Sequence, residues 1–392
     1  MLKMRRMIPL VVLALLVSSN SASFGDSKSR GEETKELVSS GIRSHGQPVR
    51  DWAPTSISTM DLVNALPNIG SDQNNGDDEW NNQIFKNQGR AKPAAIGSPS
   101  LTPISCHSSP CVTLGGVGKV ITFIPVWVGT WNASDLQQWN NTFGALVNSY
   151  GTTKPVAHVF NTNVGYFGAA QAPSLKWLGQ TATVIPLLAG TKNNCGINSR
   201  TVVTGNLYCV SDSNVGTYIS NYMKGTGAKV TDGSTPVYVY IGAKTTRLSS
   251  GFGNAYCGWH SYGTVGGTTQ PFIAIQDYDS VKIQGCSVQK VSPNVGGSVS
   301  LDAMGSVLAH EIDETLTDPN VRTGWFDAAG AENADKCGWT YGTTSLVNGA
   351  RKNFQAVVGP ITYHFLIQQN WLADNKVTES GASTGTACSI TG

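Results

Sequence analysis

Apolar residues recur along one part of this chain with the period of a helix. They are Leu301, Met304, Leu308, Ile312 and Leu316, each three or four positions after the one before. Residues at this spacing share one face of an α-helix and pack against a core. Asp318 and Pro319 follow, and the residue before a proline disfavours helical geometry. The pattern predicts a helix over residues 298–317.

Shorter runs are rich in β-branched and aromatic residues, which favour strands. They are residues 119–128, 155–161, 182–188, 236–242 and 271–277. Helical spacing of apolar residues also predicts helices after Ser134-Asp135 and over residues 214–224. The apolar stretch 356–371 predicts strands or a hairpin. Strands alternating with helices predict an α/β fold, with a mixed sheet, flanking helices and disulfides for stability.

The first residues have the layout of a secretory signal peptide. A basic start is followed by an apolar run and then by small residues over 1–23, and the run is short for a membrane span. Residues 24–105 are rich in turn-forming residues and lack periodicity, which predicts a flexible segment, a linker or a pro-segment. Residues 106–392 then form the folded domain. We expect a secreted, extracellular protein with no membrane attachment after cleavage.

The cysteine count and the glycosylation sequons agree with export, and the charge balance argues against a nucleic-acid partner. The chain has 8 cysteines, and an even number in an exported protein indicates disulfides. Pairing of neighbours predicts Cys106–Cys111, Cys195–Cys209, Cys257–Cys286 and Cys337–Cys388. Sequons at Asn132 and Asn140 predict a glycoprotein. The 27 Lys and Arg nearly balance the 25 Asp and Glu, so we expect no nucleic-acid partner.

Residues that could bind a metal or act as a general base lie near the end of the predicted helix. Glutamate is scarce after Cys106, yet Glu311, Glu314 and Glu332 lie close together in the sequence beside His310. His310 and Glu314 are four residues apart, so they project from the same helical face. Metalloproteases use this spacing in H-E-x-x-H, where the second residue is the general base. The H-E-x-x-E version here predicts a zincin-like active-site helix near 298–317.

The predicted metal ligands are His310 and Glu314, with Glu311 as the catalytic base. A tetrahedral site needs a third protein ligand. We prefer Glu332, with Asp335 as a second-sphere partner or alternate ligand. One imidazole with carboxylates suits zinc, and another divalent metal is the alternative.

Two further residues are candidates for the same site. Asp318 lies near the helical face of His310 and is a third choice as ligand. His260 is a fourth choice, and it equally suits a catalytic role as a donor to the substrate oxyanion. The competing interpretation of the whole segment is a solvated acidic helix face.

Several short motifs follow one another in a set order. They are Cys257-Gly258-x-His260, Cys286, Val307-Leu308-Ala309-His310-Glu311-x-x-Glu314-x-x-Thr317-Asp318-Pro319, Trp325, Glu332-x-x-Asp335-x-Cys337 and Ala387-Cys388. This order, over roughly residues 115–390, resembles that of the EXORDIUM-like, phosphate-induced protein family. The resemblance implies a secreted protein associated with the cell wall and extracellular matrix. It places the chain with members that retain an H-E-x-x-E motif.

Two functions are compatible with these features. The first is a secreted metal-dependent hydrolase, peptidase-like, that acts on extracellular peptides. The second is a non-catalytic module that binds a cell-wall polymer or a matrix partner and carries a structural or vestigial metal. In the second case Trp127, Trp259, Trp325 and Trp339 are candidates to stack on sugars, although core packing is the expected role of at least half of them.

Overall fold

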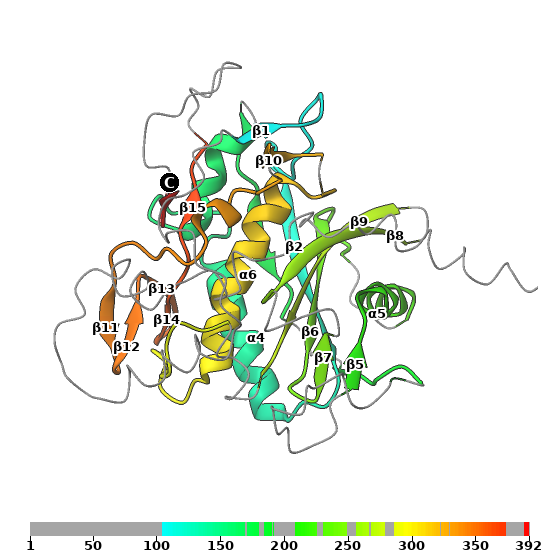
Figure 1. The fold of residues 1–392 in the computed structure, drawn as a ribbon, viewed down its shortest axis with the longest axis vertical. Coiled ribbons are helices and arrows are strands. Elements are labelled where there is room, and N and C mark those ends of the chain that lie inside the picture. The colour runs from blue at the N-terminus through cyan, green and yellow to red at the C-terminus, as the bar shows by residue number, and fades with distance from the viewer. Residues whose placement is uncertain are drawn as a thin grey trace, which may run out of the picture.

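The computed structural model has a mixed α/β fold (Figure 1), as the sequence predicts. It describes residues 104–373 and 388–391, except 169–170, 180–183, 190, 192–207, 226–229, 249–255, 266–267, 279–285, 322 and 329. The predicted signal peptide, almost all of segment 24–105, and Cys195 lie outside the described residues. Within the described part, no helix is long and apolar enough to cross a membrane.

A six-stranded sheet forms the centre of the fold. Its order is β3-β2-β6-β9-β8, and β4 also pairs with β2. The strands are β2 (Val120–Val128), β3 (Ser174–Trp177), β4 (Val184–Ile185), β6 (Thr235–Gly242), β8 (Trp259–Val265) and β9 (Thr268–Gln276). All neighbours are parallel except β8 and β9. Parallel strands are buried on both faces, and this explains the continuous apolar runs that predict β2, β6 and β9.

Helices cover both faces of this sheet. They are α4 (Ala133–Asn148), α5 (Asp212–Lys224) and α6 (Val299–Thr317). α4 and α6 lie on one face and α5 on the other (Figure 1). Each begins at a side-chain cap: Asn132, Ser211 and Ser298 accept backbone N–H groups of the first turn. All three predicted helices are confirmed.

The α6 helix is enclosed on all sides. Every residue from Ser300 to Thr317 is buried. The helix contacts β8 and β9 on one side, and η2 (Val159–Phe167) and β14 (Ile361–Phe365) elsewhere. The predicted helix is confirmed, whereas the competing interpretation of a solvated acidic face is wrong because other elements cover that face.

Smaller pairs of strands surround the main sheet. They are β1 (Ile104–Cys106) with β10 (Trp325–Asp327), β5 (Tyr208–Val210) with β7 (Thr246–Leu248), β11 (Ser345–Val347) with β12 (Ala350–Lys352), β13 (Phe354–Val358) with β14, and β15 (Asn370–Trp371) with β16 (Cys388–Ser389). The β13–β14 pair confirms the hairpin predicted within 356–371.

One predicted strand is wrong. Residues 155–161 run into the 3-10 helix η2 instead of forming a strand. The Nδ1 atom of His158 accepts the Phe160 N–H at 3.2 Å, and the Thr162 hydroxyl donates to the Val159 carbonyl at 2.8 Å. Such local bonds satisfy the backbone without a sheet partner. Of the strand predicted at 182–188, β4 covers residues 184–185, and residues 186–188 are not in a strand.

Disulfides tie the periphery together as predicted. Cys106 pairs with Cys111, Cys257 with Cys286 and Cys337 with Cys388. Cys209 is also disulfide-bonded. The Cys257–Cys286 bond fixes the chain just before β8, and the Cys337–Cys388 bond holds the 3-10 turn η4 (Asp335–Cys337). Both segments carry candidate site residues.

Candidate metal centre

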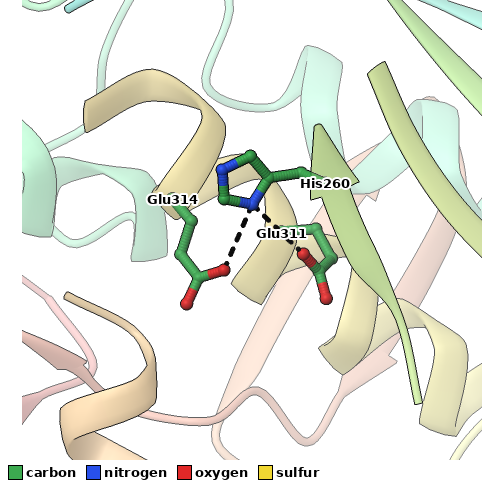
Figure 2. Close-up of side chains that lie close together, drawn as sticks. All are labelled: His260, Glu311 and Glu314. Atoms are coloured by element: carbon green, nitrogen blue, oxygen red, sulfur yellow. Dashed lines mark ion pairs between the residues drawn. The ribbon is translucent and has the colours of Figure 1, made fainter. Parts of the chain in front are cut away.

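Three separate segments bring the predicted site residues together. The helix α6 contributes His310, Glu311 and Glu314, and the edge strand β8 contributes His260. The segment that enters η4 contributes Glu332 and Asp335. We call these six residues the carboxylate cluster. Figure 2 shows the imidazole of His260 directed at the carboxylates of Glu311 and Glu314.

A glycine allows β8 to approach α6 this closely. A Cβ atom on Gly258 would lie 2.5 Å from Val307 Cγ1 and 2.8 Å from Glu311 Oε1. Any other residue would therefore push the strand away from the helix at the level of Glu311. The close approach sets His260, two residues later, over the same turn of α6.

The first potential ligand group consists of His260, Glu311 and Glu314. The Nδ1 atom of His260 is 3.3 Å from Glu314 Oε2 and 3.5 Å from Glu311 Oε2. One ligand atom from each residue lies within 4.8 Å of the others. Three donors of this kind at this spacing can hold a metal ion.

A second group shares Glu314 and lies beside the first. It consists of His310, Glu314 and Asp335. The Nε2 atom of His310 is 3.0 Å from Glu314 Oε1 and 3.5 Å from Asp335 Oδ1. The preferred third ligand, Glu332, lies instead beside the other histidine, with Oε1 3.6 Å from His260 Nε2.

The cluster is buried and short of hydrogen-bond donors. Its six residues are exposed by 6 % or less. Among the described residues, no donor from outside the cluster reaches either carboxylate oxygen of Glu311, Glu314 or Glu332, or the Oδ1 atom of Asp335. Of the described donors, only the two imidazoles of the cluster lie near these oxygens. His260 Nδ1 likewise has no described hydrogen-bond partner outside the cluster. A buried carboxylate without a partner costs several kcal/mol, so this arrangement calls for a cation.

The electrostatics agree with that conclusion. Burial raises the pKa of Glu311 to about 7 and holds the pKa of Glu332 well above its usual value. Burial alone would lower the pKa of His260, but Glu332, Glu311 and Glu314 outweigh it and raise that pKa strongly. Burial would raise the pKa of Glu314, yet the charge of His310 and the hydrogen bonds from both histidines lower it. The cluster attracts positive charge, whether a proton or a metal ion.

Backbone groups and an amide hold the two histidines from outside the cluster. His260 Nε2 lies 3.3 Å from the Asp318 carbonyl oxygen. The Asp318 carboxylate accepts the N–H groups of Thr323 and Gly324 at 3.0 and 2.7 Å, so it caps the turn after α6 rather than joining the cluster. On the other side, Gln368 Nε2 lies 3.1 Å from His310 Nδ1.

Gly258 and Gln368 were not among the residues predicted for the site. Gly258 belongs to the Cys257-Gly258-x-His260 motif, so the sequence already drew attention to this part of the chain. Gln368 comes from the segment after β14 and is distant in sequence from every other site residue. Only the folded chain shows that it touches His310.

The tryptophans proposed for sugar stacking are largely internal. Trp127, Trp259 and Trp339 are buried, and Trp325 is half-buried with its ring packed edge-on against Tyr166. The three buried rings are core residues, and their use as an exposed sugar platform is wrong.

The sequons differ in their surroundings. Asn132 is exposed and caps α4. The Asn140 amide donates to the Gly179 carbonyl at 3.0 Å and accepts the Trp177 indole N–H at 2.9 Å. Glycosylation remains a prediction at both, and at Asn140 it would compete with a bond that its amide nitrogen already makes.

No family model, no curated protein and no solved structure matches this chain. The case for function therefore rests on the geometry and chemistry of the carboxylate cluster.

Proposed function

We propose that this protein is a secreted metal-dependent hydrolase of the peptidase-like kind, with its metal in the carboxylate cluster. One observation carries the proposal. Two imidazoles and four carboxylates from three segments converge, while seven of the eight carboxylate oxygens have no donor from outside the cluster among the described residues. A divalent cation would offset the cost of burying these groups together, and it would do so at a position where the chain supplies several ligands.

The size of the ligand groups favours chemistry over a purely structural ion. Each of the two groups supplies three ligand atoms. Catalytic zinc sites use three protein ligands and keep a fourth position for water, whereas structural sites use four. A bound zinc ion makes a coordinated water acidic enough to act as a nucleophile at neutral pH. Glu311 then serves either as a ligand or as the acceptor of that proton.

Other features support export and the peptidase-like assignment. The disulfides fit an oxidising compartment. His310 and Glu314 occur at zincin-like spacing on a buried helix. The motif order that resembles the EXORDIUM-like family is consistent with an extracellular protein that encounters peptides and cell-wall polymers.

A second function is favoured by the burial of the cluster. Glu311, Glu314 and His260 are 0 % exposed, and a substrate must reach the metal for hydrolysis. A closed site suits a structural ion that joins β8, α6 and η4. In that case the protein is a non-catalytic module for a cell-wall or matrix partner.

Metal analysis together with an activity assay tests both functions. The secreted protein should contain about one divalent metal ion per chain, zinc first among those measured. It should hydrolyse peptide or ester substrates, lose this activity with a chelator and regain it with added zinc. Bound metal without hydrolysis would support the structural function, and a protein that binds no divalent ion would rule out the hydrolase and the structural ion.

A further inference from the structure

We propose that the ion binds to His260 Nδ1, Glu311 and Glu314, and that His310 is a positioning residue rather than a ligand. The proposal rests on the metal site proposed above and identifies which imidazole coordinates. It follows from the position of the proton on each ring. A neutral imidazole has one N–H donor and one lone pair, and only the lone pair binds a metal.

The surroundings of His260 leave the lone pair facing the cluster. Its Nε2 atom lies 3.3 Å from the Asp318 carbonyl oxygen, which can only accept a hydrogen bond. In the neutral ring the proton is therefore on Nε2, and Nδ1 carries the lone pair that can bind a metal. Nδ1 faces Glu314 Oε2 at 3.3 Å and Glu311 Oε2 at 3.5 Å. Three electron-pair donors thus face one another, and a cation is the group that satisfies all three.

The surroundings of His310 place its proton on the opposite nitrogen. Gln368 Oε1 accepts the Trp339 N–H at 3.0 Å, and Gln368 Nε2 donates to the Ala334 carbonyl at 2.8 Å. These two backbone partners fix the orientation of the amide. Its Nε2 atom therefore also donates to His310 Nδ1, 3.1 Å away. Nδ1 is the acceptor, so the proton of a neutral His310 is on Nε2, toward the cluster.

A metal at His310 Nε2 would break this arrangement. The ring proton would have to move to Nδ1, where it would face the Gln368 N–H. Rotating the amide to accept that proton would exchange both of its backbone hydrogen bonds for repulsive contacts. Leaving these buried hydrogen-bond partners unpaired would destabilise the folded protein. His260 needs no such rearrangement.

Metal-binding histidines usually donate their second N–H to a backbone carbonyl or carboxylate. His260 has this pattern through Asp318. His310 has the reverse pattern and directs its N–H toward Glu314 Oε1 at 3.0 Å and Asp335 Oδ1 at 3.5 Å. Glu314 therefore has one oxygen beside His310 and the other beside His260. We infer that His310 and Asp335 orient Glu314 for the ion that His260 and Glu311 hold with it.

Paired isosteric variants test the assignment. Glu311 belongs only to the first group and Asp335 only to the second, so Glu311→Gln and Asp335→Asn each remove one buried charge and little volume. Titration of the metal-free proteins with zinc should show a Kd for Glu311→Gln at least 100-fold higher than that of the wild type. Asp335→Asn should stay within about 10-fold of the wild type, as expected for a residue outside the coordination sphere. Asp313→Asn, on the same helix but outside the cluster, is the control for loss of a buried charge.

The possible outcomes separate this assignment from the proposed function. A 100-fold loss in Asp335→Asn with wild-type affinity in Glu311→Gln would move the ion to His310 and overturn the assignment, while the metal site would stand. Equal large losses in both would also overturn it, because one ion would then not be confined to the first group. A wild-type protein that binds neither zinc nor manganese would overturn the proposed function as well.

A second measurement does not depend on whether variants of the proposed ligands fold. The chain has 6 histidines, so nitrogen labelling of histidine alone gives a simple spectrum. In the zinc-bound protein, one ring should show a metal on Nδ1 and a proton on Nε2, and another should show a proton on Nε2 without metal. His310→Gln should remove the second set of signals and keep the first. Metal on the Nε2 atom of a ring that disappears in His310→Gln would contradict the assignment.

Discussion

Two buried polar regions lie side by side on α6, and they differ in how their charges are satisfied. Asp313 is 3 % exposed and Glu314 is 0 % exposed. Asp313 Oδ1 accepts from Asn163 at 2.5 Å, and its carbonyl accepts from Asn333 at 3.3 Å. Asn163 Oδ1 in turn accepts from Asn333 and Asn370 at 2.9 and 3.1 Å. Within the described structure, the carboxylate of Glu314, the next residue, is approached by no donor other than the imidazoles of His260 and His310.

The contrast shows that unpaired carboxylates are not a general property of this interior. The first region, which we call the asparagine network, consists of Asn163, Asp313, Asn333 and Asn370, and amide groups satisfy its carboxylate. The carboxylate cluster is equally buried but contains four acids and only two imidazoles. Within the described residues, amides satisfy Asp313, whereas Glu314 shares two imidazoles with three other acids. A divalent cation would match the carboxylate cluster in charge and in ligand type.

Removal of the metal should produce the largest effect on stability. A ligand present at about 1,000 times its Kd stabilises the folded state by about 4 kcal/mol. A chelator should therefore lower the free energy of unfolding of the wild type by roughly this amount, as measured by denaturant titration. Glu314→Gln should respond much less to the chelator because its metal is already lost. An equal response in the variant and the wild type would show that the stabilising ion binds elsewhere.

A histidine away from any carboxylate should show a smaller, pH-dependent effect. His158 lies among Tyr150, Phe160 and Phe354, and burial lowers its pKa from 6.5 to about 4. The pKa of Tyr150 is raised to about 12 by burial and by Asp313, so this tyrosine does not titrate in the same range.

Between pH 4 and 6.5 the unfolded chain holds more protons at this position than the folded chain does. Its contribution to stability is therefore complete above pH 6.5 and is lost as the pH falls toward 4. The difference in unfolding free energy between the wild type and His158→Gln should grow by about 3 kcal/mol from pH 4 to pH 7. A flat difference would mean that folding does not lower the pKa of His158.

The asparagine network should lose stability without any dependence on metal. Asn163→Ala removes the donor to Asp313 and the acceptor for two neighbouring amides. Leaving such buried groups unpaired should cost about 2 kcal/mol. The loss, measured by denaturant titration, should be the same with and without a chelator. A loss that appears only in one condition would show that the two regions act as a single unit.

Local patterns were sufficient for much of the fold. Apolar spacing predicted α6 to within a residue of its ends, because a helix repeats every 3.6 residues and Ser298 and Pro319 mark its limits. Continuous apolar runs predicted β2, β6 and β9, because strands in the middle of a parallel sheet are covered on both sides. The segment after Pro155 was misjudged because its β-branched residues favour a strand, while the His158 side chain supplies the backbone with a local partner instead.

The sequence by itself determined the composition of the site. Scarce glutamates near His310, at helical spacing, identified the segment and its candidate ligands, because residue type and spacing along one helix are local properties. The tertiary structure decided what those residues face. It placed β8 against α6, which was possible because Gly258 has no side chain. It also put a carbonyl beside one histidine and an amide beside the other. These contacts join segments far apart in the chain, so no local pattern specifies them, and they decide which imidazole offers a lone pair to a metal.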